Sequence, residues 1–321
     1  MHRNLSSEHH WGVILAGGEG VRLRSLTRLV SGDDRPKQFC ALLGGTTLLN
    51  QTRRRIRRSI SQRRTLFVLL RAHECFYTQE LRGVPPAQTV VQPRNCGTLP
   101  AILASLMHIV DRDRRAVVGI FPSDHYYADE QQFRAGVELA FGMAETKPES
   151  VVLLGAPAKH AETGYGWIEA EAQLSPHSHD GLLRVKRFWE KPSPPVARDL
   201  LERGCVWNTF VMVGRAQAFL DMARSGAPEL YRAFETMRDR CWPETYEEAM
   251  RAVYEGIETA DFSQSILSAN PEMLRVLCLG DVGWSDLGEP GRVIGVLEQK
   301  GVEREWATLW HRESAATAAA C

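Results

Sequence analysis

The sequence predicts an α/β fold with a Rossmann-like, doubly wound and mostly parallel sheet, and two observations predict it. Short apolar runs alternate with longer stretches in which apolar residues recur every three or four positions. This alternation is typical of βαβ units, in which helices pack on a parallel sheet. A glycine-rich turn follows the first run directly, and open α/β sheets bind ligands at that end of a strand.

The first half of the chain carries the clearest alternation. Strands are predicted at residues 11–16, 65–70, 89–92, 116–121 and 151–156. Helices are predicted between them at residues 46–60, 98–113 and 130–146. After about residue 160 the pattern changes to strands at 165–172, 182–190 and 206–214, followed by several helices. We interpret residues 160–300 as an extension of the sheet with a substrate lid, and residues 301–321 as a tail that frays.

Composition excludes several classes of partner. Lysine and arginine together number 39, as do aspartate and glutamate, so no overall positive field attracts nucleic acid or an anionic membrane. No apolar run approaches membrane-spanning length, and we expect a cytoplasmic protein without nucleic-acid or membrane partners. The seven cysteines form no CxxC pair and no zinc pattern, which favours reduced, mostly buried thiols.

The glycine turn is a candidate phosphate site. Consecutive N–H groups of Gly17 and Gly18 can form an anion-binding nest, and Arg22 and Lys37 follow near the same strand end. Two known phosphate-binding motifs do not fit this turn. A dinucleotide fingerprint would need a third glycine where Leu23 stands, and a Walker loop would need Gly-Lys-Ser/Thr, which is absent. The cations favour a polyphosphate ligand. The alternative is that they are solvated loop charges.

Asp124 is a candidate magnesium ligand. It follows the predicted buried strand 116–121 and therefore lies at the carboxyl edge of the sheet, beside the glycine turn. Magnesium prefers one or two carboxylates together with phosphate oxygens and water, so a second aspartate is expected. The alternative is a turn or capping role. His125 lies next to Asp124, but we do not assign it a catalytic role.

The motif ILAGGEGVRL followed by RPKQF resembles the opening motif of the sugar-phosphate nucleotidyltransferases, and RPKQF is similar to that of the mannose-1-phosphate guanylyltransferases. The likeness continues in order through QPRNCGTLPAI, FPSDHYY, TGYGWIE, FWEKPSPP, VWNTFVMVG and VGWSDLG. The resemblance implies a nucleotide-diphospho-sugar transferase fold over residues 11–300. It divides this domain into a nucleotide-binding half, 11–160, and an inserted sugar-binding subdomain, 160–300.

The resemblance also implies an activity. A sugar 1-phosphate oxygen attacks the α-phosphorus of a nucleoside triphosphate and releases pyrophosphate, with Mg2+ as cofactor and with GTP and mannose 1-phosphate as the favoured pair. Because the nucleophile is already anionic, catalysis reduces to positioning and charge neutralisation. Bifunctional relatives carry a further isomerase domain, and we expect no isomerase activity from a chain of 321 residues. The sequence leaves open whether the chain forms a homo-oligomer.

The resemblance assigns a role to each motif. Arg22 and Lys37 neutralise the triphosphate, Lys191 contacts the sugar phosphate, and Asp286 joins Asp124 as a metal ligand. The predicted nucleotide contacts are Ala16, Gly17, Gly18, Gln92, Asn95, Gly97 and Thr98. The predicted sugar contacts are Gly166, Glu190, Asn208 and Asp261. From its position alone, Thr98 is also expected to be a helix N-cap.

Departures from the family pattern keep alternatives open. Val21 replaces the usual threonine, Arg24-Ser25 replaces Trp-Pro, and residues 30–34 lengthen the loop before RPKQF. The alternatives are another nucleotide or hexose phosphate and a regulatory homologue that binds without turnover. A third, a dinucleotide-dependent oxidoreductase, is disfavoured by the missing third glycine. For the arginine-rich run 53–64 we favour a solvated helix face over a nucleic-acid site, and for His108 a structural role.

Overall fold

A computed structural model of the chain describes residues 8–171, 181–240, 246–307 and 310. Within these residues a nine-stranded sheet has the order β3-β2-β1-β4-β8-β5-β9-β7-β6. The strands are β1 (His10–Leu15), β2 (Thr65–Leu70), β3 (Thr89–Gln92), β4 (Val117–Pro122), β5 (Val151–Pro157), β6 (Gly166–Ala170), β7 (Leu182–Glu190), β8 (Val206–Arg215) and β9 (Leu274–Cys278). The predicted α/β fold is confirmed.

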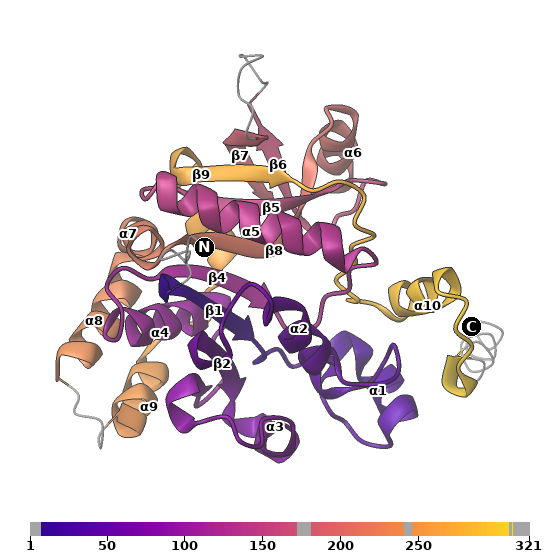
Figure 1. Cartoon of the computed structure of the whole chain (residues 1–321), viewed down its shortest axis with the longest axis horizontal. Coiled ribbons are helices and arrows are strands. Elements are labelled where there is room, and N and C mark those ends of the chain that lie inside the picture. The colour runs from indigo at the N-terminus through magenta and orange to yellow at the C-terminus, as the bar shows by residue number, and fades with distance from the viewer. Residues whose placement is uncertain (1–7, 172–180, 241–245, 308–309, 311–321) are drawn as a thin grey trace, which may run out of the picture.

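Helices cover the sheet on both faces (Figure 1). They are α1 (Arg24–Ser31), α2 (Leu48–Ile56), α3 (Glu74–Glu80), α4 (Thr98–Val110), α5 (Glu130–Thr146), α6 (Pro194–Glu202), α7 (Ala216–Gly226), α8 (Pro228–Arg240), α9 (Tyr246–Gly256) and α10 (Pro290–Gln299). Val13 and Ile14 of β1 point to opposite faces and belong to two separate cores. The first core contains α4 and α7, and the second contains parts of α2 and α5.

The two halves of the sheet differ in strand direction. The β1–β2, β2–β3 and β1–β4 pairs are parallel, as predicted for the first half. Beyond β4 the pairings are mainly antiparallel, because β8 returns from the second half and inserts between β4 and β5. The second half therefore completes the central sheet, and the sheet as a whole is mixed.

Three local expectations were wrong. Strand β9 pairs parallel to β5 in a region where only helices were predicted. Helix α2 ends at Ile56, before the predicted residue 60. Thr98 is the first residue of α4 and Gly97 is its N-cap, because the Thr98 hydroxyl accepts a hydrogen bond from the Phe262 N–H instead.

The structure also bears on the expectations for the cysteines, His108, membrane-spanning helices and the C-terminal tail. Cys40, Cys96 and Cys205 are buried thiols as predicted, whereas Cys75 and Cys278 are exposed. His108 hydrogen-bonds the Ala87 carbonyl oxygen at 2.8 Å. Among the described residues, no helix combines the length and the apolar character needed to cross a membrane. Of the tail predicted to fray, 301–321, the structure describes 301–307 and 310, where Val302, Trp306 and Trp310 pack against a hydrophobic cluster; the other tail residues lie outside the described ones.

Candidate active site

The backbone brings three loops to one edge of the sheet. Leu15 of β1 and Pro122 of β4 are in register, and the Ser123 N–H donates to the Leu15 carbonyl oxygen at 3.2 Å. The glycine turn and the Asp124 loop therefore leave the sheet side by side. Tyr126 then forms an antiparallel bridge with Ser285, which places the loop of Asp286 against that of Asp124.

These loops surround a cavity of about 370 Å³. Most of the predicted site residues line it: Gly18, Arg22, Lys37, Thr98, Asp124, Gly166, Glu190, Lys191, Asn208, Asp261 and Asp286. Ala16, Gly17, Gln92, Asn95 and Gly97 are not part of its lining. Residues predicted from motifs at opposite ends of the chain, from Gly18 to Asp286, thus meet at one place.

The RPKQF segment supports the glycine turn. Gly20 has a left-handed backbone with φ of 60°, and a Cβ there would lie 3.1 Å from the Lys37 nitrogen. Gln38 is buried, and its Nε2 donates to the carbonyl oxygens of Ala16 at 3.0 Å and Gly18 at 2.7 Å. Gln38 lies inside the RPKQF motif, but nothing in the local sequence indicates this role. Its amide fixes the turn whose N–H groups are predicted to bind phosphate.

Lys37 is the most firmly held cation of the cavity. Its Nζ donates to the backbone oxygens of Asp286 at 2.6 Å and Leu287 at 3.3 Å, and lies 3.4 Å from Asp124 Oδ2. The ammonium therefore connects the two predicted metal ligands. Arg22 differs, because its side chain is 63% exposed and its one ion pair with a described residue is to Glu289, at 3.6 Å.

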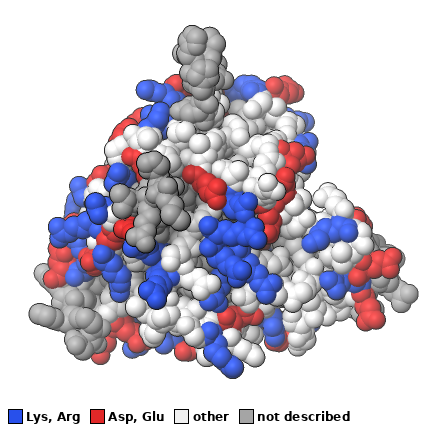
Figure 2. All heavy atoms as spheres, viewed as in Figure 1, with Lys and Arg blue, Asp and Glu red and all other residues white. Residues whose placement is uncertain are grey.

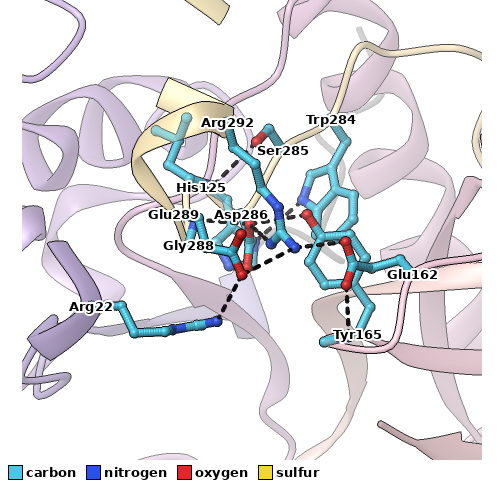
Figure 3. A network of polar contacts seen from close by, with 12 residues as sticks. Arg22, His125, Glu162, Tyr165, Trp284, Ser285, Asp286, Gly288, Glu289 and Arg292 are labelled. Carbon is cyan, nitrogen blue, oxygen red and sulfur yellow. Dashed lines mark hydrogen bonds and ion pairs between the residues drawn. The ribbon is translucent and has the colours of Figure 1, made fainter. Parts of the chain in front are cut away.

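Asp286 is the centre of a polar network (Figure 3). Its Oδ1 accepts hydrogen bonds from the Tyr165 hydroxyl at 3.0 Å, the Gly288 N–H at 2.8 Å and Arg292 Nη1 at 2.7 Å. Burial alone would raise the pKa of this carboxyl, but the positive groups around it, including Lys37 and Arg292, hold the pKa below its ordinary value. Asp286 is therefore ionised in the folded protein.

Arg292, a partner of Asp286, also contacts Glu162 and Tyr165. Arg292 Nη2 donates to Glu162 Oε2 at 2.6 Å, and its guanidinium lies 4.5 Å from the centre of the Tyr165 ring. Burial raises the pKa of the Tyr165 phenol, which stays protonated and can donate to Asp286. Sequence reasoning missed Glu162, Tyr165 and Arg292. Tyr165 lies inside the quoted motif TGYGWIE, whereas α10 offered no local signal for Arg292.

Asp124 has a much simpler environment. No hydrogen bond from a described residue reaches its carboxylate, and its ionic neighbours are Lys37 and His125, whose Nε2 lies 3.9 Å away. Burial lowers the pKa of His125, and His125 Nδ1 accepts a hydrogen bond from Trp284 Nε1 at 3.3 Å. The imidazole is thus a neutral, packed wall of the cavity.

The opposite wall combines small and polar residues. A Cβ on Gly166 would lie 2.8 Å from the Phe188 ring and 3.0 Å from Glu190 Oε2, so glycine lets this carboxylate come close to the strand. Burial raises the pKa of Glu190, and its Oε1 lies 3.0 Å from Lys191 Nζ. Asn208 is buried, and its Oδ1 accepts the Phe210 N–H, which leaves the amide nitrogen for a ligand.

Strained backbone conformations occur at or next to this cavity. Among the described residues, left-handed φ values outside glycine occur at Lys191 (44°), Phe210 (61°) and Leu287 (48°). Lys191 and Phe210 line the cavity, and Leu287 directly follows Asp286. Each such conformation costs about 1–3 kcal/mol and persists mainly where function or surrounding structure requires it. This strain marks the cavity independently of any motif.

The predicted base-reading loop joins the glycine turn and the segment around residue 261. Asn95 Nδ2 donates to Glu19 Oε1 at 3.3 Å, and Thr98 Oγ1 donates to Asp261 Oδ2 at 3.1 Å. Gln92 is buried, and its Oε1 accepts from the Tyr254 hydroxyl at 3.1 Å. Thr98 lines the cavity, whereas Asn95 and the buried Gln92 do not.

The carboxylates allow a test of whether a metal ion fits. Asp124 and Asp286 line one cavity, and neither Asp124 nor Asp286 Oδ2 accepts a hydrogen bond from the described residues. No group of three or more His, Cys, Asp or Glu side chains that could hold a metal occurs within the described ranges. A cation would therefore take its remaining ligands from phosphate and water, which is the usual arrangement for Mg2+.

Comparison with known proteins agrees with this geometry. A family model described as nucleotidyl transferase matches residues 11–299, which is most of the chain. The chain belongs to the nucleotidyl transferase family. The alginate biosynthesis protein AlgA of Pseudomonas aeruginosa is 35% identical over 224 residues, covering 68% of this chain and 44% of AlgA.

Two further relatives of this nucleotidyl transferase carry names that refer to mannose 1-phosphate. Mannose-1-phosphate guanylyltransferase 2 of Escherichia coli O157:H7 is 27% identical, over 86% of this chain and 57% of that protein. A Thermus thermophilus structure, described as a mannose-1-phosphate geranyltransferase, has a TM-score of 0.75 and 26% identity over 87% of this chain and 76% of that one. The chain spans about half the length of the curated relatives that it matches.

Proposed function

We propose that this nucleotidyl transferase joins a nucleoside triphosphate to a sugar 1-phosphate, with GTP and mannose 1-phosphate giving GDP-mannose and pyrophosphate. One observation carries the proposal. The cations Arg22, Lys37 and Lys191 and the carboxylates Asp124 and Asp286 line a single cavity at the carboxyl ends of β1 and β4. Relatives named for mannose 1-phosphate guanylyl transfer support the choice of substrates.

The reaction needs positioning and charge neutralisation more than proton transfer. An oxygen of the sugar 1-phosphate forms a bond to the α-phosphorus, and the bond from that phosphorus to the bridging α–β oxygen breaks. Pyrophosphate leaves with the electron pair of that bond. Since the attacking oxygen is already anionic, the cavity can do without a general base. The groups required are those that offset negative charge as the two substrates meet.

The cations are placed to serve different parts of the substrates. Lys37, held by Asp124 and by the Asp286 backbone, is positioned at the glycine turn where the triphosphate would lie. Arg22 at the exposed rim can hold outer phosphate oxygens bidentately. Lys191 extends from the opposite wall, beside Glu190, and would meet the sugar phosphate. The two substrates would therefore be neutralised from opposite sides.

Charge balance favours a divalent cation as cofactor. The cavity lining contains the cations Arg22, Lys37 and Lys191 but four carboxylates, from Asp124, Glu190, Asp261 and Asp286. Two phosphate-bearing substrates would add further negative charge, which these three cations alone do not balance. We propose that Asp124 and Asp286 hold Mg2+, which when bound would supply positive charge to the phosphate oxygens.

The sugar side is the proposed origin of specificity. Glu190, Asn208 and the Gly166 backbone face the cavity, and carboxylates and amides can bond several hydroxyls at once. Asp261, next to Thr98, lies between this wall and the base-reading loop. We propose that these groups bind the hexose and that Asn95, Gly97 and Thr98 lie near the base.

The direct test is pyrophosphate release by the purified chain with Mg2+. Four nucleoside triphosphates are combined with mannose 1-phosphate and with glucose 1-phosphate. Rapid release only with GTP and mannose 1-phosphate is the expected result. Release with another pair would keep the reaction and change the substrates. No release with any pair, together with binding of GDP-mannose, would contradict the enzymatic proposal and indicate a regulatory homologue.

A further inference from the structure

A second polar hollow lies on the outer surface of the helix layer, away from the cavity described above. It has a volume of about 670 Å³ and is lined by Arg54, Arg55, Arg57, Arg58, Glu130, Gln131 and Arg134. These residues come from the end of α2, the two residues that follow it and the start of α5. Figure 2 shows a dense patch of basic side chains on the face where these helices lie in Figure 1.

The hollow has an uncompensated positive charge. Arg55 pairs with Glu130 at 3.2 Å, and Arg134 lies 3.8 Å from Glu138. Arg54, Arg57 and Arg58 are exposed and form no ion pair with any described residue. Neighbouring like charges on a helix are mutually unfavourable, and a bound anion would relieve the repulsion.

The lining selects a class of anion. A guanidinium can bind two oxygens of a phosphate at once, and several here face one hollow. The lining contains no aromatic side chain, so a nucleobase could stack only on guanidinium planes that would otherwise bind phosphate. The formal net charge of the chain is zero, so an extended nucleic-acid track is not favoured. These features together fit a small phosphate-bearing molecule without an aromatic ring.

Arg55 connects this hollow to the loop of Asp124. Its side chain is only 3% exposed, and Nη1 donates to the His125 carbonyl oxygen at 3.3 Å. The same Nη1 donates to Thr52 Oγ1, whose hydroxyl donates to the Ser123 carbonyl oxygen at 3.2 Å. The backbone on both sides of Asp124 is thus held from α2, by Arg55, which lines the hollow, and by Thr52, which Arg55 contacts.

We propose that this hollow is a second ligand site for a small, non-aromatic molecule with two or more phosphate groups, either a sugar phosphate or a condensed phosphate. Through Arg55, the bound ligand restrains the backbone of residues 123–125. This assignment does not depend on the reaction proposed above, because it rests on a different surface and can be tested by binding alone.

The test uses tripolyphosphate and fructose 1,6-bisphosphate as probes, at constant ionic strength and without Mg2+. Calorimetry measures affinity, and hydrogen exchange read by mass spectrometry locates the protected amides. Wild-type protein is expected to gain protection at residues 53–60 and 123–127. The double variant Arg54→Glu/Arg58→Glu is expected to bind at least about tenfold more weakly at this site.

A control variant carries the same change of charge at two exposed arginines outside the hollow. Arg82 and Arg232 are exposed and form no ion pair with a described residue, so Arg82→Glu/Arg232→Glu should retain the wild-type affinity within about twofold. The variant Arg54→Gln/Arg58→Gln removes the two charges without reversing them. Thermal unfolding of every variant shows whether weaker binding comes from a loss of folding instead. The probe with the higher affinity identifies the sugar phosphate or the condensed phosphate.

Several outcomes would overturn the proposal. Equal affinities for the two Glu double variants would remove the hollow as a site, as would protection confined to the glycine turn at residues 16–24. Binding of a single-stranded oligonucleotide, lost in Arg54→Glu/Arg58→Glu and without any binding of the phosphate probes, would assign the patch to nucleic acid. Protection of residues 53–60 without a change at 123–127 would overturn the coupling through Arg55.

Discussion

Asp124 and Asp286 line the same cavity, but their loops hold them in opposite ways. Asp286 Oδ1 accepts three hydrogen bonds and is paired with Arg292, whereas no described residue donates a hydrogen bond to Asp124. One carboxylate is part of the folded framework, and the other is held near Lys37 with its oxygens available. Two residues with the same proposed chemical role are therefore expected to contribute differently to stability. Substitutions at each can test this.

The largest effect on rate is expected for Asp124→Asn. Loss of the carboxylate should reduce pyrophosphate release by about 10³-fold, equivalent to about 4 kcal/mol in the barrier. The thermal midpoint should fall less than for Asp286→Asn, because the substitution removes the ion pair with Lys37 at 3.4 Å but no hydrogen bond from the described residues. Asp129→Ala is the control, since Asp129 caps α5 through the Gln132 N–H and should cost about 1 kcal/mol of stability with little effect on rate. A near-normal rate for Asp124→Asn with Mg2+ would refute the metal assignment.

Asp286→Asn should lower both the rate of pyrophosphate release and the stability of the fold. The rate is expected to fall about 100-fold, and the free energy of unfolding by about 2 kcal/mol, since an amide cannot replace a carboxylate that is hydrogen-bonded to Arg292. Urea denaturation and pyrophosphate release measure the two effects. An equal decrease in the free energy of unfolding for Asp124→Asn and Asp286→Asn would contradict the different roles given to the two carboxylates.

Arg292→Gln tests whether the network positions Asp286. Removal of the guanidinium leaves Asp286 and Glu162 without their shared partner, and we expect a loss of about 1–2 kcal/mol in stability and about tenfold in kcat. Arg292→Lys should restore part of the stability, because it retains the charge but not the two-pronged geometry. A change in KM alone, with kcat and stability unaltered, would assign Arg292 to substrate binding instead.

Tyr165→Phe should give the smallest effect. It removes one hydrogen bond to Asp286 Oδ1 and keeps the ring that packs against Arg292, so a loss of about 1 kcal/mol in stability and less than about fivefold in rate is expected. Tyr126→Phe is a suitable control, since no hydrogen bond of the Tyr126 hydroxyl to a described residue is found. Equal losses for the two variants would mean that the Tyr165 hydroxyl contributes nothing through Asp286.

Local sequence signals predicted the first half of the fold well. The predicted strands at 65–70 and 89–92 coincide with β2 and β3, and the glycine turn and Asp124 lie at the expected edge. These predictions succeed because periodicity and the geometry of parallel strands act over short stretches of chain. Motif resemblance extended them to Lys191, Asn208 and Asp286, all of which reach the cavity.

Contacts between distant segments were beyond the reach of the sequence pattern. Nothing local indicates that β8 inserts between β4 and β5, or that residues 274–278 form a strand beside β5. The same holds for the exposure of individual arginines. Within the run expected to be a solvated helix face, Arg55 is buried against Glu130 while Arg54 and Arg58 border an open hollow.

The sequence by itself determined the fold class and the place of the glycine turn, because these depend on residue type and on short-range periodicity. Its motifs predicted which residues form the site. Only the tertiary structure decided that Arg292 and Tyr165 engage Asp286 while Asp124 stays available. Whether a carboxylate is engaged depends on which donors from other segments come within hydrogen-bond distance. Such proximity is set by packing of the whole chain.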